Sequence, residues 1–424
     1  MSSAFRTVRG MKDLYDLDII KYNYLIERSI KVAMQHGYKI METPILEYTE
    51  VFQRSIGDET DVVSKEMYTF LDRGDESVTL RPEGTAGIIR AIVTNNITQS
   101  LPIKLMYYGP MFRYDRPQKG RYRQFHQIGF ENIGDKTPHV DALTILLASD
   151  ILYAVGIFEF KMAINTLGDE ESKSSYTKAV VKYFSRHEQK LSEDSKRRLK
   201  TNPLRILDSK EAEDIEVCSM APIMGDYLNK ESEAYFSKVC QILEEHGVPY
   251  EVDNFLVRGL DYYTHTAFEI KTSAKNVGSV GGGGRYDNLV KMFGGPDVSG
   301  VGFAFGAERV MSLINDNAVL QKTTRFAVVS VSDSENDIAF KIMRTLHNCS
   351  ILCEFIASGN IGKKMKIADR LGCDIVFIIG EREKKDKTIT VKFMRITDEK
   401  DKSTTINMEE VTRFAKFHEE KTVT

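Results

Sequence analysis

Two apolar runs that flank a basic segment form the most distinctive pattern of the chain. Both runs, residues 105–113 and 124–131, are predicted to be β-strands. The segment between them reads DRPQKGRY over residues 115–122. Because proline and glycine favour turns, this segment predicts a long loop that joins the two strands into a hairpin.

One face of this hairpin is predicted to be partly cleared of side chains, because side chains alternate between the two faces of a strand. On that face the sequence places Tyr107, Gly109, Met111, Arg113, Phe125, Gln127, Gly129 and Glu131. A glycine inside a strand often marks the close approach of a ligand or of another backbone, which predicts a binding floor bordered by Arg113, Gln127 and Glu131. An ordinary hairpin with a solvated basic tip is the alternative, and this pattern leaves both open.

The N-terminal part is predicted to begin with a helix and a short strand. Residues 14–37 form an amphipathic pattern that ends at a glycine, and residues 38–46 follow as a strand. Because Pro44 cannot donate a hydrogen bond to a neighbouring strand, this strand is expected at a sheet edge or at an interface.

A junction between a strand and a helix holds candidate ligand groups. The predicted strand 77–80 is followed by RPEGT and by a helix from Ala86 onwards, with Thr85 as its expected cap. Glu83 and Thr85 lie at this junction, where ligand-binding groups are common. Helix capping and turn formation would explain the same two residues, and the sequence leaves that alternative open.

Residues 167–248 differ from the rest of the chain, since they are charged, rich in predicted helix and poor in glycine. We interpret them as a helical insertion. The basic run KRR at residues 196–198 fits either a solvated helix face or an RNA contact. The strand pattern returns at Tyr250 and continues through residues 255–264 and 267–271.

Two glycine-rich segments follow. Residues 278–287 read GSVGGGGRYD, and successive glycines allow a backbone to approach a flat or phosphorylated ligand closely. Residues 300–306 read GVGFAFG and lead into a predicted helix, residues 307–314, with Arg309 in its first turn. A buried arginine there would be costly without an anion. Neither segment matches the P-loop or the dinucleotide-binding motif.

A polar linker, residues 315–324, is predicted to separate a last domain. Beyond it, strands alternate with helices, which predicts a small α/β domain. One rim of this domain is expected to be basic, through Lys363, Lys364, Lys366, Arg370 and Arg382.

Composition places the chain among globular proteins of two or three domains, with 424 residues of which 42% are hydrophobic and 28% charged. The formal net charge is −3, so nucleic-acid binding would need a local basic patch. Five cysteines, an odd number in a long chain, favour a reducing, cytoplasmic location over a disulfide framework, and their spacing predicts no zinc site. Neither a signal peptide nor a membrane span is expected.

Together these segments resemble the class II aminoacyl-tRNA synthetases, and among them the histidyl-tRNA synthetase family. Motif 1 of the class resembles residues 37–48, motif 2 resembles FRYDRPQKGRYRQFHQ at 112–127, and motif 3 resembles GVGFAFGAER at 300–309. Sequences typical of the histidine family resemble LRPEGT, LVRGLDYYT and GGGRYDNL in this chain. Thr264 and Asn288 depart from the usual asparagine and glycine.

The resemblance implies an α+β fold with an antiparallel sheet core, flanking helices, a helical insertion and a C-terminal α/β anticodon-binding domain. Residues 1–166 and 250–318 would form the catalytic core, 167–249 the insertion and 325–424 the anticodon-binding domain. It also implies a homodimer formed through motif 1.

The implied reaction joins L-histidine to tRNA(His) at the expense of ATP, through a histidyl-adenylate, with Mg²⁺ bound to ATP and with release of AMP and pyrophosphate. The resemblance makes Arg113 and Arg258 the catalytic residues. It assigns histidine binding to Glu83, Thr85, Arg113, Gln127, Glu131, Arg258, Tyr262, Tyr263 and Tyr286. It assigns ATP binding to Arg113, Arg121, Arg258 and Arg309, and the tRNA acceptor end to Arg116 and Gln118. No protein residue is assigned as a metal ligand.

Two other functions share part of this pattern. A non-catalytic relative, resembling the regulatory subunit of ATP phosphoribosyltransferase, would keep the core but usually lacks the anticodon domain and the histidine signatures. This chain has Arg258, Glu131 and the residues beyond 325. In a plain RNA-binding or scaffold protein, the arginine side chains would be charged groups exposed to solvent and would not form a substrate site. Histidine-dependent exchange of pyrophosphate into ATP would distinguish the enzyme from both alternatives.

Overall fold

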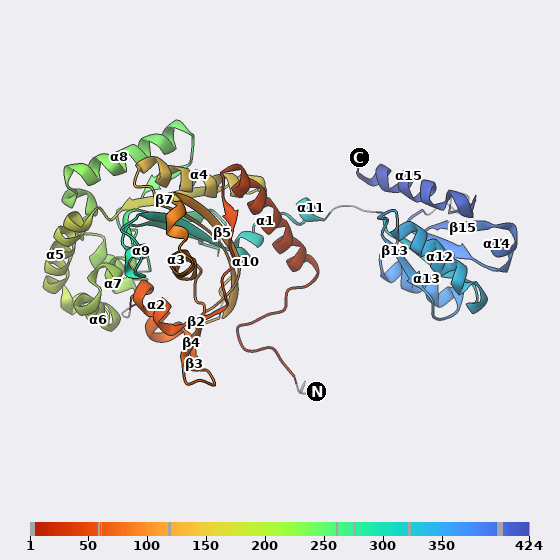
Figure 1. The fold of residues 1–424 in the computed structure, drawn as a ribbon, viewed down its shortest axis with the longest axis horizontal. Helices are drawn as coiled ribbons and strands as arrows, with labels where there is room; N and C mark the ends of the chain where they lie inside the picture. Colours follow the sequence, from red (N-terminus) through yellow and green to blue (C-terminus); the bar gives the residue numbers. More distant parts are fainter. Residues whose placement is uncertain are drawn as a thin grey trace. The chain divides into compact units, whose positions relative to one another are not determined.

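The computed structural model describes residues 5–57, 60, 62–117, 120–259, 262–274, 277–320, 324–396 and 402–423. The chain forms two compact units, Met1–Val319 and Leu320–Thr424, each with its own β-sheet (Figure 1). The proposed division of the first unit at residues 167 and 249 stays a prediction.

The first unit is built on a sheet whose described strands lie in the order β1-β5-β6-β11-β10-β9-β7-β8. Neighbouring strands are antiparallel except for the two outer pairs, β1 with β5 and β7 with β8. The strands are β1 (Lys39–Ile40), β5 (Ile103–Phe112), β6 (Gln124–Ile133), β7 (Phe160–Thr166), β8 (Tyr250–Val252), β9 (Thr264–Thr272), β10 (Ser279–Tyr286) and β11 (Gly300–Gly306). The sheet confirms the predicted antiparallel core.

Strands β5 and β6 confirm the predicted hairpin. Tyr107 lies opposite Gly129, and Gly109 lies opposite Gln127. Paired residues share a face of the sheet, so the predicted floor residues do lie on one side. Strand β5 ends at Phe112, which leaves Arg113 just beyond the ladder.

Apolar side chains on the two faces of the sheet belong to separate cores. Met106, Phe130 and Phe303 pack with α1 (Asp16–Gln35), α4 (Pro138–Ala154), α8 (Lys230–Glu245) and α10 (Ala307–Met311). On the other face, Leu105 and Tyr107 pack with α3 (Thr85–Thr94) and with residues of the helical insertion. Shorter helices complete the unit: α2 (Thr49–Ile56), η1 (Val62–Glu66), η2 (Ile97–Ser100), α9 (Leu289–Met292) and α11 (Asp316–Val319).

A small antiparallel sheet of order β2-β4-β3 lies beside α2. Its strands are β2 (Leu46–Tyr48), β3 (Tyr68–Leu71) and β4 (Ser77–Leu80). The predicted continuous strand over residues 38–46 is therefore wrong. The chain pairs first as β1 and again as β2, because Pro44 lies between them and cannot donate to a ladder. Strand β1 does lie at an edge of the main sheet, as expected.

The insertion is helical, as predicted. It contains α5 (Glu170–Arg186), η3 (Glu188–Lys190), α6 (Glu193–Thr201), η4 (Pro203–Asp208), α7 (Ala212–Cys218), η5 (Met224–Tyr227) and α8. Asp169 caps α5 by accepting from the Ser172 amide at 2.9 Å, and Asn229 caps α8 by accepting from the Ser232 amide at 2.9 Å. The Asn229 amide nitrogen also donates to Asp169 at 2.7 Å, so the two helices begin at one linked pair. Helix α8 then packs against α4 of the core.

The expected strand over residues 255–264 is wrong. The described residues 253–259 and 262–263 have no helix or strand, and β9 begins only at Thr264. Arg258 therefore projects from a loop. The expected helix after motif 3 is also shorter than predicted, since α10 ends at Met311.

The second unit is a separate α/β body with the sheet order β13-β12-β14-β15-β16. Strands β13, β12 and β14 are parallel, and β15 and β16 continue antiparallel. Its elements are β12 (Phe326–Ser330), η6 (Asp333–Glu335), α12 (Asn336–His347), β13 (Cys353–Ile356), α13 (Ile361–Arg370), β14 (Ile375–Ile379), α14 (Glu381–Asp386), β15 (Thr388–Phe393), β16 (Ser403–Asn407), η7 (Met408–Glu410) and α15 (Val411–Val423).

Lys364 corrects the prediction of a basic rim on this unit. Its side chain is fully buried, and its ammonium group donates to the main-chain oxygen and the hydroxyl of Ser330 at 2.9 and 2.8 Å. The other four rim residues are exposed, namely Lys363, Lys366, Arg370 and Arg382. A helix turn of 3.6 residues explains this, since Lys364 faces the sheet while its neighbours face solvent.

The five cysteines are free thiols, as the odd count suggested. Among the helices of the described residues, none is long and apolar enough to span a bilayer.

Candidate active site

The floor of the predicted site is filled rather than cleared. The Tyr107 ring lies over Gly129 and against Gly84, and a Cβ atom on either glycine would overlap it. Gly109, with φ of +143°, leaves room for the Arg81 guanidinium, whose Nη2 would lie 2.7 Å from an added Cβ. The two strand glycines therefore accommodate the protein's own side chains, and the expectation that they clear space for a ligand is wrong.

Glu83 occupies the N-terminus of α3. Its carboxylate accepts hydrogen bonds from the amides of Thr85 and Ala86, at 2.7 and 2.8 Å. The N-cap position is Gly84, and Glu83 just before it satisfies the first helix amides, so the prediction that Thr85 caps this helix is wrong. Burial raises the pKa of Glu83 above its ordinary value, although these amide bonds act in the opposite direction.

The Thr85 hydroxyl is therefore available for a hydrogen bond to strand β6. It donates to one oxygen of Glu131 at 2.8 Å, and the Tyr286 hydroxyl donates to the other oxygen. Gly302 on β11 lies directly against this carboxylate, where any Cβ would overlap it. Glu131 is only 1% exposed, and burial raises its pKa to about 8. The carboxyl group is thus fixed from three sides.

Three tyrosines form an aromatic wall next to this carboxyl group. The rings of Tyr262 and Tyr263 lie 4.6 Å apart, and those of Tyr262 and Tyr286 lie 5.7 Å apart, edge to face. All three are buried, and burial raises each pKa above 10, so their hydroxyls remain donors at neutral pH. A planar ring with polar nitrogens would find both apolar faces and hydrogen-bonding groups here.

Arg258 connects this wall to the charged part of the site. Its Cζ lies 5.9 Å from the centre of the Tyr263 ring, and its Nη1 donates to Glu269 at 2.6 Å. Gly282 provides the space, because a Cβ there would lie 2.9 Å from Arg258 Nη1. The Nε of Arg258 is buried, with no hydrogen-bond partner among the described residues. One donor is therefore available for an acceptor that binds here.

Three further arginines, Arg113, Arg121 and Arg309, lie close enough together for the first two to act on the charge of the third. Arg113 donates to the main-chain oxygen of Pro82 at 2.8 Å, and Arg121 pairs with Asp115 at 3.2 Å. Arg309 donates to the main-chain oxygen of Ser279 at 2.6 Å. Burial lowers the pKa of Arg309, and the charges of Arg121 and Arg113 lower it further while that of Glu269 raises it. This mutual repulsion marks a local excess of positive charge.

Three predicted site residues remain, of which one lies in the site and two lie between β5 and β6 in the sequence. Gln127 lies on β6, and its Oε1 is buried with no partner among the described residues. Arg116 is exposed in the hairpin loop, while Gln118 lies outside the described residues. The structure thus brings together Glu83, Thr85, Arg113, Gln127, Glu131, Arg258, Tyr262, Tyr263, Tyr286 and Arg309, with Arg121 beside Arg309.

Two supporting pairs were missed in the sequence. His126 on β6 uses its main-chain amide and its Nδ1 to bind Glu308 of α10, at 3.1 and 2.8 Å. Buried Arg285 binds Asp141 on α4 through two of its nitrogens. The partners are 182 and 144 residues apart, so no local pattern could have paired them. Both tie strands of the site to the helical layer behind them.

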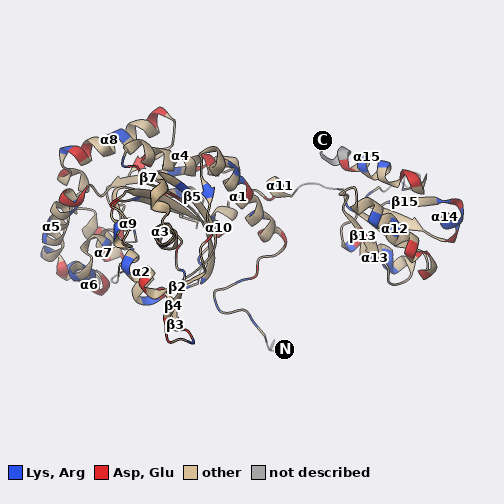
Figure 2. Ribbon diagram, in the orientation of Figure 1, with Lys and Arg blue, Asp and Glu red and all other residues tan. Residues whose placement is uncertain are grey.

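The basic run at residues 196–198 is neutralised locally. Lys196 pairs with Glu193 at 2.7 Å, and Arg198 pairs with Asp194 at 2.8 Å, while Arg197 also contacts Asp194. Figure 2 shows basic and acidic residues interspersed along α5 and α6. This arrangement agrees with a solvated helix face.

Two family models match the chain. Residues 10–310 match the model described as histidyl-tRNA synthetase, and residues 325–417 match the model described as anticodon binding domain. The first match covers well over half of the chain.

Curated relatives match over nearly the full length. A histidine–tRNA ligase of Rhodospirillum rubrum is 43% identical over 392 residues, which cover 92% of this chain and 94% of that protein. A histidine–tRNA ligase of Bacillus licheniformis is 40% identical over 426 residues, which cover 98% of this chain and 100% of that protein.

Solved structures share the fold. The apo histidyl-tRNA synthetase of S. aureus has a TM-score of 0.80 at 34% identity, covering 97% of this chain and 100% of that one. A Bacillus halodurans protein described as an ATP phosphoribosyltransferase regulatory subunit/histidyl-tRNA synthetase has a TM-score of 0.65 at 23% identity, covering 90% of this chain and 99% of that one. At that identity the second likeness shows the fold alone.

Proposed function

Because the chain belongs to the histidyl-tRNA synthetase family, it is a ligase that joins histidine to tRNA, and we propose how its residues carry out this reaction. In the first step the histidine carboxylate attacks the α-phosphorus of ATP, so that pyrophosphate leaves and histidyl-adenylate forms. In the second step a ribose hydroxyl of the terminal adenosine of tRNA(His) takes the histidyl group and AMP leaves.

The histidine side chain is proposed to bind between Glu131 and the tyrosine wall. The observation that carries this proposal is the buried Glu131 carboxyl group, held by Thr85 and Tyr286 beside the aromatic rings. An imidazole has one donor and one acceptor nitrogen, which a carboxyl group and a phenol can satisfy together. Since a site built to bond polar atoms rejects analogues that lack them by about 10⁴-fold or more, no editing activity is required.

The α-ammonium group of histidine is proposed to bind near Glu83, Thr85 and Gln127. Gln127 offers its buried, unpaired Oε1 as an acceptor. Glu83 supplies a buried carboxylate, although its two oxygens already accept from main-chain amides. Each carboxylate oxygen can accept more than one hydrogen bond, so Glu83 can still accept a hydrogen bond from an ammonium group.

ATP is proposed to bind through the arginines. Arg113 and Arg258 would hold the α-phosphate and neutralise the charge that develops there, and Arg309 with Arg121 would bind the outer phosphates. Displacement at phosphorus depends mainly on positioning and on fixed positive charge. The repulsion between Arg309, Arg121 and Arg113 supports this role, because a bound polyanion would relieve it.

The divalent metal used by this family is proposed to be Mg²⁺ that arrives with ATP. Magnesium prefers phosphate oxygens, water and one or two carboxylates. Two carboxylates bonded to these arginines fit that donor set, Glu269 beside Arg258 and Asp115 beside Arg121. When bound, the ion would neutralise phosphate charge, and these two side chains would help to hold it.

The second unit is proposed to read the anticodon of tRNA(His). Its match to an anticodon-binding family model supports this role, as do the exposed Lys363, Lys366, Arg370 and Arg382. The hairpin loop with Arg116 and Gln118 is proposed to meet the acceptor end. A chain truncated after Val319 should then keep most of its adenylate formation and lose most of its aminoacylation; equal losses would contradict this division.

A cytoplasmic homodimer is the proposed assembly. The β1 edge and the small sheet expose large apolar side chains, with Ile40 at 50%, Tyr48 at 56% and Leu71 at 63%. An open sheet edge beside exposed apolar groups favours pairing with another chain. A second copy is the expected partner because this surface includes the segment that resembles motif 1.

Pyrophosphate exchange into ATP, measured with each of the twenty amino acids, tests the function. We expect exchange with histidine alone, together with charging of tRNA(His). Exchange with another amino acid would contradict the assigned specificity. Complete absence of exchange, with tRNA binding retained, would instead favour a non-catalytic relative.

A further inference from the structure

The segment between β8 and β9 carries three proposed site residues but has little support of its own. It holds Arg258, Tyr262 and Tyr263, and its described residues 253–259 and 262–263 belong to no helix or strand. Within it, the Leu256 amide donates to Asp253 at 3.0 Å. No main-chain bond between described residues is donated by residues 257–259 or 262–263. Groups outside the segment must therefore hold it in place.

The start of the segment is held by the sheet. Asn165 of β7 is buried, and its side-chain nitrogen donates to the main-chain oxygens of Leu256 and Asn254, at 3.0 and 3.3 Å. This support ends two residues before Arg258. The later part must be fixed by something else.

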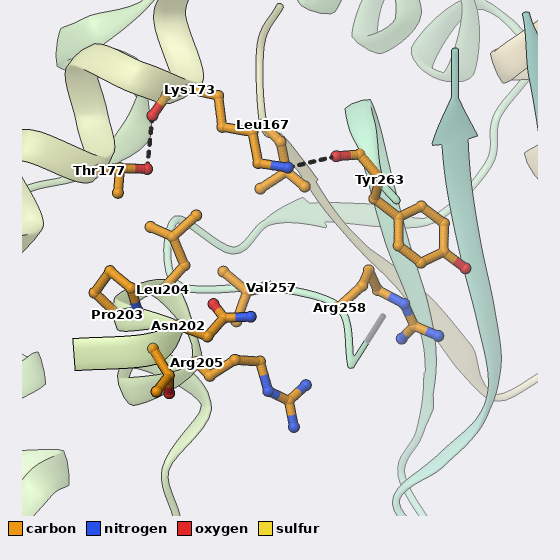
Figure 3. Close-up of a pocket in the computed structure, with 11 residues that line it drawn as sticks. Leu167, Lys173, Thr177, Asn202, Pro203, Leu204, Arg205, Val257, Arg258 and Tyr263 are labelled. Atoms are coloured by element: carbon orange, nitrogen blue, oxygen red, sulfur yellow. Dashed lines mark hydrogen bonds between the residues drawn. The ribbon is translucent and has the colours of Figure 1, made fainter. Parts of the chain in front are cut away.

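Lys173 of α5 holds the end of the segment. Its ammonium group donates to the main-chain oxygen of Tyr263 at 3.0 Å, as Figure 3 shows. The Lys173 main-chain oxygen in turn accepts from Thr177 at 2.8 Å within α5. A contact from the helical insertion therefore sets the main chain that carries the Tyr263 ring.

Arg205 of η4 meets the middle of the segment. In Figure 3 its side chain extends from the insertion toward the loop that carries Arg258. A Cβ atom on Gly259 would lie 3.0 Å from Arg205 Nη1, so the guanidinium packs directly on that glycine. The Nη1 atom is buried without a hydrogen-bond partner among the described residues. Its contact with the segment is one of packing.

A cavity of about 240 Å³ lies between the insertion and the segment. Its lining includes Lys173, Leu204 and Arg205 on one side and Val257, Arg258 and Tyr263 on the other (Figure 3). Apolar side chains of the insertion and of the segment share one core around this cavity, and Lys173 and Arg205 are two polar side chains of the insertion that reach the segment.

We propose that Lys173 and Arg205 are positioning residues through which the helical insertion sets the placement of Arg258 and Tyr263. The inference rests on the proposed function, since it assumes that both targets contact substrate. Reactive groups must be held to within a fraction of an ångström by supporting side chains, and a displacement of 1 Å can cost about 100-fold in rate.

The first test compares Lys173→Met with Lys178→Met, an exposed position on the same helix. The readouts are the KM for histidine and kcat in pyrophosphate exchange, together with the thermal midpoint. We expect Lys173→Met to raise the KM for histidine about tenfold or more with an unchanged midpoint, and Lys173→Arg to recover most of the loss because it keeps a donor. Lys178→Met should match the wild type.

The second test uses Arg205→Met with Arg186→Met, an exposed arginine of α5, as its control. Arg205→Met should raise the KM for histidine as well. Gly259→Ala should also raise it, and its effect should shrink in the Arg205→Met background, because the added methyl group then has no guanidinium to displace.

Two outcomes would overturn the inference. In one, the Lys173 and Arg205 variants behave like their controls. In the other, they lose thermal stability and kcat together and Lys173→Arg recovers neither, which would mean that both residues only stabilise the fold. If the wild type itself lacks histidine-dependent exchange, the proposed function fails and not only this inference.

Discussion

Thr85 donates its hydroxyl hydrogen to Glu131 at 2.8 Å, which joins the first turn of α3 to the central strand β6. The contact is possible because Glu83 satisfies the helix amides in place of Thr85. Glu83 thus satisfies the helix amides, and Thr85 orients the carboxyl group that is proposed to bind imidazole.

Replacing Thr85 by valine removes this donor and keeps the shape of the side chain. The lost bond to a buried carboxyl group should raise the KM for histidine in pyrophosphate exchange about tenfold, corresponding to about 1.5 kcal/mol. Thr85→Ser retains the hydroxyl and should remain close to wild type. Equal KM values for the valine and serine variants would contradict the role of the hydroxyl.

Glu131 should make the ligand-free protein less stable as pH rises. The pKa of its carboxyl group is 4.5 by reference and about 8 in the fold because of burial, so between these values the folded state binds more protons than the unfolded chain. The free energy of unfolding therefore falls through this window, by up to about 1.4 kcal/mol per pH unit.

Thermal midpoints from pH 5 to 8 can test this, with Glu131→Gln as the variant and Glu251→Gln, at a carboxylate whose side chain is 44% exposed, as the control. The Glu131 variant should lose much of the decline, whereas the control should keep it. A Glu131→Gln protein whose midpoint falls as steeply as that of the wild type would contradict the raised pKa.

Arg309 should determine affinity for ATP rather than for histidine. Burial and the charges of Arg121 and Arg113 lower its pKa, which indicates a position prepared for an anion. Arg309→Met should raise the KM for ATP at least about tenfold, and Arg309→Lys should be intermediate because lysine lacks the planar fork.

Steady-state kinetics of pyrophosphate exchange give both KM values for these variants. Lys161→Met, at an exposed position of β7, serves as the matched control. A larger change in the KM for histidine than in the KM for ATP would contradict this assignment.

A charge on the small sheet should separate the proposed homodimer. Leu71 of β3 is 63% exposed in the single chain, and Leu71→Glu would bury a carboxylate in the interface. Sedimentation equilibrium should give twice the chain mass of 48.2 kDa for the wild type and the single mass for the variant. Leu352→Glu in the second unit, at a leucine that is 49% exposed, should remain dimeric. A monomeric wild type would contradict the proposed assembly.

The sequence predicted those elements that depend on local pattern. The hairpin β5–β6, the strand of motif 3 with its following helix, and the alternation in the second unit all follow from periodicity and turn residues. The candidate site residues came from motif resemblance, and the structure brings most of them together. Their assigned roles stay predictions.

The wrong predictions share a physical cause: the conformation or burial of each residue depends on contacts with residues far away in the sequence. Residues 255–263 have a strand-like composition, but the main-chain hydrogen bonds of the neighbouring strand β7 are made with β8 and β9 instead. Gly129 suggested open space, yet Tyr107 from the opposite strand fills it. Lys364 has the charge of a surface residue, but Ser330 of β12 offers it two acceptors in the interior. None of these contacts can be recognised in a local stretch of sequence.

The linked caps Asp169 and Asn229 have a consequence for how the protein folds. Each side chain closes one helix, and the two side chains bond to each other across 60 residues of chain. Each cap forms within its own helix, but the bond between the two side chains forms only when both helices are docked, so α5 and α8 are expected to open as one cooperative unit. The chain between them is therefore held as a closed loop only while both helices are docked.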